Sequence, residues 1–153
     1  MIIKQITPAD AKERLDAGDG SVYVDVRSEP EFAAGHVPGA VNIPVFHLDA
    51  ATRQMRPNPD FGRVASSALP KEGRFIVGCQ MGGRSQKACE ILQQAGYADL
   101  SNVRGGFGGA RDPGGRVTEP GWAQMNYPVS TDAADGESYA SLRARATSGS
   151  ETS

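Results

Sequence analysis

Short apolar runs alternate with stretches of helical periodicity along most of this chain. Runs that are rich in β-branched residues and bounded by turn residues predict strands at 1–6, 21–27, 40–44, 74–78 and from 99 onward. Between them, apolar positions recur at helical spacing, most clearly at 84–95, where Ala88, Ile91, Leu92 and Ala95 share one face. Strands that alternate with helices predict an α/β domain with a mostly parallel sheet.

Capping residues mark the ends of several predicted helices. Thr7 and Pro8 suit the first positions of a helix that ends near Gly18, and the segment 28–31 matches a capping box. Gly96 suits the end of the helix at 84–95. Residues 46–69 carry weaker helical patterns that the segment RPNPD interrupts.

The composition changes near residue 131. From there the chain is rich in Ser, Ala, Thr, Asp and Gly and poor in large apolar residues, so we predict a disordered tail over 131–153, with a weak helical signal near 139–145. The folded domain is then 1–130, with its core at 18–130. Within the Gly- and Pro-rich segment 105–121, residues 112–115 suit the tip of a small hairpin.

Charge and hydropathy narrow the range of partners. The chain has 153 residues, a net charge of -2 and a pI near 5.7, so it is not a general nucleic-acid binder. Its apolar runs are all far shorter than the roughly 20 residues of a membrane span, and its start lacks the apolar stretch of a signal peptide. We therefore expect a cytoplasmic monomer without nucleic-acid or membrane partners.

The segment FIVGCQMGGRSQ places Cys79 between a predicted strand and a predicted helix. The carboxyl ends of parallel strands are where sites form in such sheets. Backbone N–H groups at a glycine-rich turn, a helix N-terminus and Arg84 all favour a thiolate, so Cys79 is a candidate nucleophile in an anion-binding loop. Glycines 82 and 83 are expected to provide the unusual backbone angles that such a loop needs. The alternative is a plain glycine-rich connection with an incidental cysteine.

The other cysteine and the histidines do not suggest a metal site. Two cysteines and two histidines at scattered positions do not match zinc-ligand spacing, so no metal or other cofactor is predicted. Cys89 is expected to be a buried core residue. His36 is expected to make structural hydrogen bonds in a turn, and Trp122 to pack in the core over the last helix.

The spacing from Cys79 to Arg84 is one residue shorter than the Cys-x5-Arg loop of protein tyrosine phosphatases. The tighter loop should favour a single sulfur on the cysteine over a phosphoryl group. A small phosphatase or arsenate reductase therefore stays a minor alternative.

Three motifs in order resemble the single-domain, rhodanese-like sulfurtransferases: YVDVRSEPEFAAGHVPGAVNIP, CQMGGRS and a GG turn followed by Gly-Trp and Pro-Val. The resemblance runs from about residue 5 to residue 130. It implies a three-layer fold with a central sheet of about five strands. It also implies that Cys79 forms a persulfide and that the sulfur is held by the loop residues Gln80, Met81, Gly82, Gly83, Arg84 and Ser85.

The same resemblance implies supporting residues and substrates. Asp25 and Arg27 would lie near the base of the loop, and the strand-end rule also places them there because they end the predicted strand at 21–27. They would hold the loop through an ion-pair and hydrogen-bond network, with direct catalysis as the alternative, and Glu31 would cap the helix after them. Sulfur would pass from thiosulfate or a persulfide donor to cyanide or a thiol by double displacement, without a cofactor. A second hypothesis is a persulfide carrier that exchanges sulfur with a protein partner.

Three arginines lie near the Gly- and Pro-rich segment. Arg104, Arg111 and Arg116 could form a rim that attracts an anionic donor such as thiosulfate. This hypothesis rests on composition alone.

Overall fold

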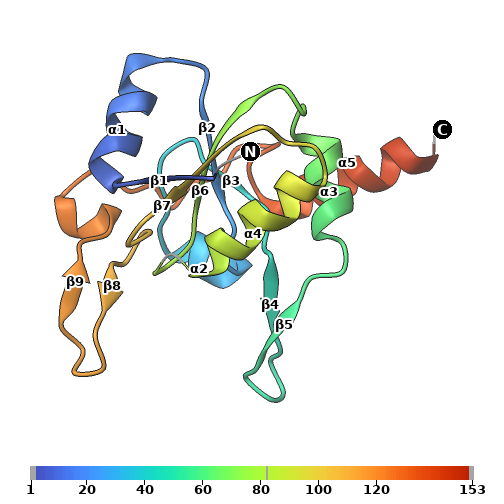
Figure 1. The fold of residues 1–153 in the computed structure, drawn as a ribbon. Helices are drawn as coiled ribbons and strands as arrows, with labels where there is room; N and C mark the ends of the chain where they lie inside the picture. Colours follow the sequence, from blue (N-terminus) through green and yellow to red (C-terminus); the bar gives the residue numbers. More distant parts are fainter. Residues whose placement is uncertain (1–2, 82, 152–153) are drawn as a thin grey trace.

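The centre of the computed structural model, which describes residues 3–81 and 83–151, is a parallel sheet of five strands (Figure 1). The strands are β1 (Lys4–Ile6), β2 (Val22–Asp25), β3 (Val41–Asn42), β6 (Arg74–Gly78) and β7 (Asp99–Val103). Their order across the sheet is β1-β7-β6-β2-β3. The predicted parallel sheet is confirmed, and each strand lies within or beside its predicted run.

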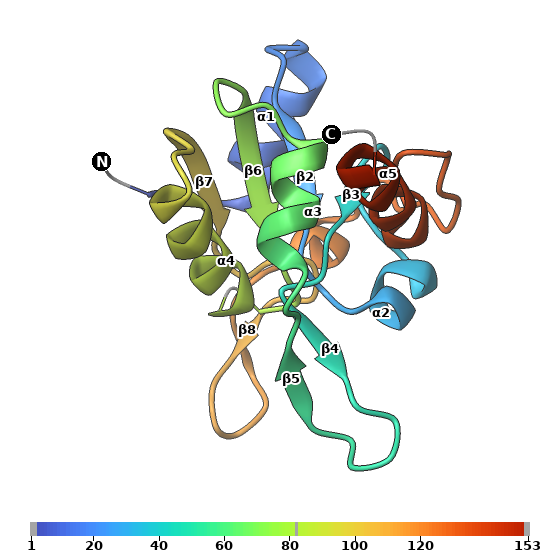
Figure 2. The same cartoon turned by 90° about the vertical axis from the view of Figure 1, so that its right-hand side faces the viewer.

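Alternating side chains of the strands separate two apolar layers. In β6, Phe75 and Val77 face a core that includes residues of α3 (Phe61–Ala68) and α4 (Gly83–Gln94), whereas Ile76 faces the opposite layer. That second layer includes residues of α1 (Pro8–Ala17), α2 (Glu29–Ala34) and the short 3-10 helix η1 (Trp122–Met125). Figure 2 shows α3 and α4 in front of the sheet and α1 behind it, so the three-layer arrangement is confirmed.

The predicted caps fix where the helices begin and end. The Thr7 hydroxyl accepts a hydrogen bond from the backbone N–H of Asp10 at 3.1 Å, and the Asp10 carboxylate accepts one from the N–H of Thr7. The helix α1 ends at Gly18, whose φ of 64° lies in the left-handed region that glycine adopts readily. The capping box predicted at 28–31 is present at α2.

The prediction of helical structure was wrong for residues 46–57. These residues form an antiparallel hairpin of β4 (Phe46–Leu48) and β5 (Met55–Pro57). At its turn the Asp49 carboxylate accepts hydrogen bonds from the N–H groups of Ala51 and Thr52. Such local side-chain-to-backbone bonds compete with helix formation. Helix begins only with α3, after the second proline of the segment.

A second hairpin confirms the prediction at 112–115. Strands β8 (Ala110–Arg111) and β9 (Val117–Glu119) pair in antiparallel fashion, and the N–H of Gly115 donates to the carbonyl of Asp112. Both hairpins project from the edge of the sheet where β2, β6 and β7 end (Figures 1 and 2).

The prediction of a disordered tail was wrong for the described part of 131–153. Helix α5 (Tyr139–Glu151) packs against α3, and Tyr139, Leu142 and Ala146 are buried in the core. These residues lie at helical spacing on one face, and Asn58 donates a hydrogen bond to the Tyr139 hydroxyl. The average composition of the tail concealed this small apolar stripe, so the folded domain extends past residue 130. In the described part of the chain, every helix is too short or too polar to cross a membrane.

Candidate active site

Cys79 lies directly after β6 at the carboxyl end of the sheet, and α4 begins four residues later at Gly83. Its side chain is almost fully buried, at 1% exposure. The positive end of the α4 dipole lies next to the loop, which suits an anionic sulfur or a bound anion. The topology thus brings together the cysteine and the helix N-terminus that the sequence predicts.

A hydroxyl and an amide lie behind the cysteine sulfur. The Cys79 thiol donates to Oγ of Ser85 at 3.4 Å, and the Ser85 hydroxyl donates to Oδ1 of Asn102 at the end of β7. Asn102 is fixed in turn because its Nδ2 donates to Gln5 at 2.9 Å. A hydroxyl can donate or accept, so Ser85 can accept from the thiol and can turn to donate to a thiolate.

A buried ion pair lies at the base of the loop. Asp25 and Arg27 are each 3% exposed in their side chains, and Arg27 Nη2 lies 2.8 Å from Asp25 Oδ2. The same guanidinium donates to Oε1 of Gln80 at 3.1 Å and to the carbonyl of Gly35 at 2.7 Å. It also stacks over the ring of Phe107, 4.4 Å from the centroid. The predicted network therefore joins the end of β2 to the active-site loop.

Arg84 was expected to add a positive charge beside the sulfur, but its guanidinium forms a two-bond ion pair with Glu31. The two guanidinium nitrogens lie 2.7 and 2.9 Å from the two Glu31 oxygens. Glu31 also accepts from the hydroxyl and N–H of Ser28 at the start of α2, which is the predicted capping role. The pair fixes the direction of Arg84 and ties α2 to the loop.

The ion pair with Arg84 lowers the pKa of Glu31. Burial alone would raise the pKa of Glu31, but hydrogen bonds from Arg84 and Ser28 and the charge of Arg84 outweigh it, so the pKa falls from 4.5 to about 2. A lowered carboxyl pKa stabilises the folded state above the unfolded value near 4.5, and this contribution is lost as the pH falls toward 2.

Replacing Glu31 by glutamine should therefore destabilise the protein at neutral pH and much less in acid. We expect the difference in free energy of unfolding between the native chain and Glu31→Gln to shrink between pH 4.5 and about 2. Urea denaturation at several pH values measures this difference. A difference that stays constant with pH would contradict the assignment.

The glycine-rich segment after β7 packs backbone to backbone against the start of the loop. The N–H of Phe107 donates to the carbonyl of Cys79 at 2.8 Å, and the N–H of Gly108 donates to the carbonyl of Gln80 at 2.9 Å. A Cβ at Gly106, whose φ is +56°, would lie 2.3 Å from the Cys79 carbonyl oxygen. Close approach of two backbones is thus the reason for glycine here, and the sequence carries no local signal for this role.

The other predicted loop residues differ in their exposure and conformation. Met81 is 51% exposed beside the site. Gly83 is the first residue of α4, and a Cβ there would meet open space, so the surroundings would accept a side chain at this position. Gly82 lies outside the described residues.

Three further residues have structural positions. Burial raises the pKa of the Cys89 thiol to about 12, and Cys79 adds to the shift, so Cys89 stays a neutral core thiol. The ring nitrogens of His36 lie 2.7 and 2.8 Å from the carbonyls of Phe32 and Asp132, which confirms its structural role. Trp122 is buried as predicted, but against Tyr23 and Tyr127 rather than over the last helix.

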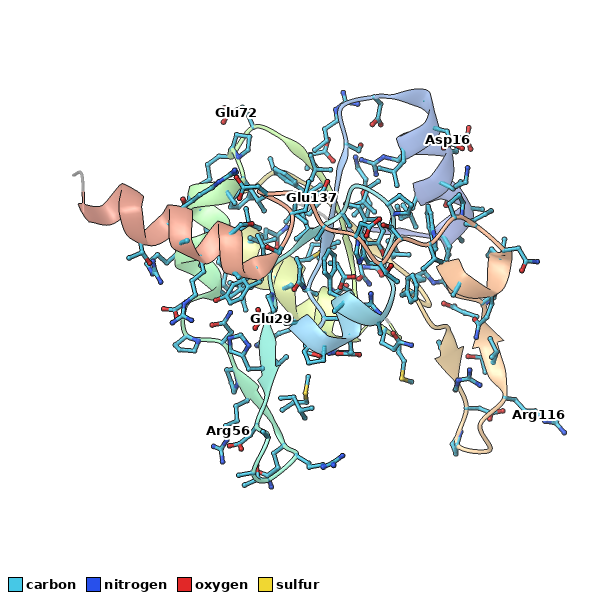
Figure 3. The ribbon with its side chains drawn as sticks, turned by 180° about the vertical axis from the view of Figure 1, so that it is seen from behind. Asp16, Glu29, Arg56, Glu72, Arg116 and Glu137 are labelled. Atoms are coloured by element: carbon cyan, nitrogen blue, oxygen red, sulfur yellow. The ribbon has the colours of Figure 1, made fainter. Side chains whose placement is uncertain are left out.

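The arginines proposed as a rim make contacts within their own neighbourhood. Arg104 pairs with Glu119, and Arg111 donates to the carbonyl of Gly115 inside the hairpin. Arg116 points outward from the hairpin tip in Figure 3. Among the described residues, these contacts give no support to a rim that binds a small anion.

Sequence reasoning missed two polar partners at the site. Asn102 ends a parallel strand, so the strand-end rule that singled out Asp25 also points to it. The pairing of Glu31 with Arg84 joins residues 53 positions apart and has no local signal. Within the described residues, no cluster of three or more His, Cys, Asp or Glu side chains is placed to hold a metal ion.

The fold and this site define a class of protein: an α/β domain with a cysteine loop between a central strand and a helix. The family model of the rhodanese-like domain matches residues 7–111. The chain belongs to this family of rhodanese-like sulfurtransferases.

Curated relatives are similar over most of the domain. Thiosulfate sulfurtransferase 16 of Arabidopsis thaliana is 41% identical over 58% of this chain and 72% of its own length. Thiosulfate sulfurtransferase 18 of the same plant is 33% identical over 85% of both chains. The human thiosulfate:glutathione sulfurtransferase is 40% identical over 64% of this chain and 84% of its own length.

A solved structure supports the fold. The crystal structure of Rv0390 from M. tuberculosis superposes with a TM-score of 0.71 at 27% identity, covering 86% of this chain and all of that one.

Proposed function

We propose that this protein moves a sulfane sulfur from thiosulfate, or from a persulfide donor, to a thiol or cyanide through a persulfide on Cys79. The observation that carries the proposal is the buried Cys79 thiol between β6 and the N-terminus of α4, at the start of a Cys-x4-Arg loop. Relatives named for thiosulfate sulfurtransferase activity support the choice of donor.

In the first step, the Cys79 thiolate attacks the outer sulfur of thiosulfate. A Cys79–sulfur bond forms, the sulfur–sulfur bond of thiosulfate breaks, and sulfite leaves with the bonding pair. The Ser85 hydroxyl can donate to the thiolate before attack, and the N-terminal end of α4 favours the anionic donor.

In the second step, the acceptor takes the outer sulfur of the persulfide. Its nucleophile bonds to that sulfur, the bond to Sγ breaks, and the Cys79 thiolate is restored. Neither step needs an oxidant or a general base. The Asp25–Arg27 pair and the Gly106 segment take no part in the chemistry and act as positioning groups for the loop.

Steady-state kinetics with thiosulfate and cyanide test the proposal. Because the donor product leaves before the acceptor binds, double-reciprocal plots at several cyanide concentrations should be parallel. Intersecting lines would indicate direct transfer within a ternary complex and contradict a Cys79 persulfide.

A further inference from the structure

Large apolar side chains are exposed on both hairpins and in the active-site loop. Among the described residues, Leu48, Met55, Met81, Val117 and Val129 are between 41% and 51% exposed. Leu48 and Met55 are cross-strand partners in the β4–β5 hairpin, and Val117 lies on β9 of the other hairpin. Single exposed apolar residues are ordinary, but a group of them around one feature indicates a binding surface. We call this group the mouth surface.

Backbone contacts place both hairpins beside the active-site loop. The residue before β4, Val45, donates its N–H to the carbonyl of Val26, next to Arg27. On the other side, Gly108 bonds to Gln80 just before β8 begins. Figures 1 and 2 show the two hairpins projecting from this same edge. The buried Cys79 therefore lies between two projecting hairpins.

Two other members of the mouth surface are Met81 and Val129, and neither lies on a hairpin. Met81 is in the loop, two residues after Cys79. Val129 lies beside Gly35, since a Cβ at Gly35 would be 3.1 Å from Val129 Cγ1. The carbonyl of Gly35 in turn accepts a hydrogen bond from Arg27. Met81 thus lies in the loop, and Val129 lies near Arg27, which supports the loop.

The charges of the hairpins favour an acidic partner. The hairpins carry Arg53, Arg56, Arg111 and Arg116 against three acids, although the whole chain is net negative. The acids make contacts of their own: Asp49 pairs with Arg56, Asp112 accepts from the N–H of Arg116, and Glu119 pairs with Arg104. Within the described part of the chain, Arg53, Arg111 and Arg116 form no salt bridge, so these three hairpin charges stay available to a partner. In Figure 3 the side chain of Arg116, near the tip of the β8–β9 hairpin, points away from the domain.

From this arrangement we propose that the mouth surface docks a protein whose acceptor thiol lies on a protruding segment with acidic and apolar neighbours. The proposal rests on the proposed function and names the acceptor class. Cys79 is almost fully buried and both hairpins project beyond the end of β6, so a protruding segment suits this geometry better than a flat surface. The partner thiolate bonds to the outer sulfur of the Cys79 persulfide, the bond to Sγ breaks, and Cys79 leaves as the thiolate.

The test uses the full chain, thiosulfate as donor and short cysteine peptides as acceptors. One peptide has a central cysteine flanked by leucine and then by acidic residues, and a second has lysine in place of each acid. We expect the acidic peptide to show a kcat/KM about tenfold higher than the basic one. We expect the double variant Leu48→Ser/Met55→Ser to show a kcat/KM with the acidic peptide about tenfold lower than that of the native chain. The single variant Arg53→Glu should show a similar loss.

Two controls separate docking from chemistry. Cyanide is too small to use the hairpins, so all variants should keep the native rate with cyanide. Arg143→Glu makes the same charge change as Arg53→Glu on the exposed face of α5 and should leave the peptide rate unchanged.

The possible outcomes are distinct. Equal kcat/KM values for the two peptides would overturn the docking proposal, and so would hairpin variants that keep the peptide rate as Arg143→Glu does. The proposed function would still stand if the native chain turns over cyanide. A native chain that shows no turnover with thiosulfate and cyanide would overturn both the docking proposal and the proposed function. A dimer of the native chain in sedimentation that Leu48→Ser/Met55→Ser abolishes would assign the surface to a second copy of this chain and overturn an acidic partner.

Discussion

Gly106→Ala is expected to reduce sulfur transfer by about 100-fold or more, because a misplacement of about 1 Å at a catalytic group can cost that much. The new Cβ would lie 2.3 Å from the carbonyl oxygen of Cys79 and 2.9 Å from its carbonyl carbon. Both are backbone atoms that no side-chain rotation can move away. The φ of +56° adds strain for any residue with a side chain. The loop must therefore shift, and kcat/KM with thiosulfate and cyanide measures the result.

Two other glycines provide graded controls for this effect. A Cβ at Gly108 would meet mainly the side-chain amide of Gln80, which can rotate away, so Gly108→Ala should lose much less activity. Gly114→Ala, at the tip of the β8–β9 hairpin, meets only Asp112 Oδ1 at 3.4 Å and should be neutral. Near-native activity of a folded Gly106→Ala would contradict the role of this segment as the support of the loop.

Arg27→Leu is expected to lower the free energy of unfolding by about 3–5 kcal/mol, because it leaves a buried carboxylate without its partner. Asp25 and Arg27 are each 3% exposed, and Arg27 also supports Gln80 and the carbonyl of Gly35. Urea denaturation of the native chain and the variant measures the change.

An exposed pair of similar geometry is the matched control. Arg56 lies 2.9 Å from Asp49, but the two side chains are 59% and 29% exposed, so Arg56→Leu should cost only about 0–1 kcal/mol. The double variant Asp25→Leu/Arg27→Leu should recover part of the loss, since it removes the unpaired charge as well. A cost for Arg27→Leu no larger than that for Arg56→Leu would show that the buried pair does not support the loop.

Local signals were enough to predict the sheet and the centre of the site. The β-branched run before Cys79 and the capping residues around α1 and α2 act over a few positions, so they are visible in the sequence. The strand-end rule then placed Asp25, Arg27 and Cys79 on one edge without any long-range information.

The features that the sequence did not predict depend on distant partners or on few residues. The salt bridge of Arg84 with Glu31 joins α4 to α2, and the close approach of Gly106 to Cys79 joins two loops. Helix α5 buries only three apolar side chains in its described part, too few to change an otherwise polar composition. In the β4–β5 hairpin, the bonds of Asp49 outweighed a weak helical pattern.

The central claim is that Cys79 carries a persulfide, and intact mass spectrometry after incubation with thiosulfate tests it most directly. The account predicts that the native chain gains the mass of one sulfur atom, that cyanide removes it, and that Cys79→Ser gains nothing. Cys89→Ser, at the buried neutral thiol, should gain the sulfur like the native chain. A native chain that gains no sulfur, or a Cys79→Ser variant that still does, would contradict the account.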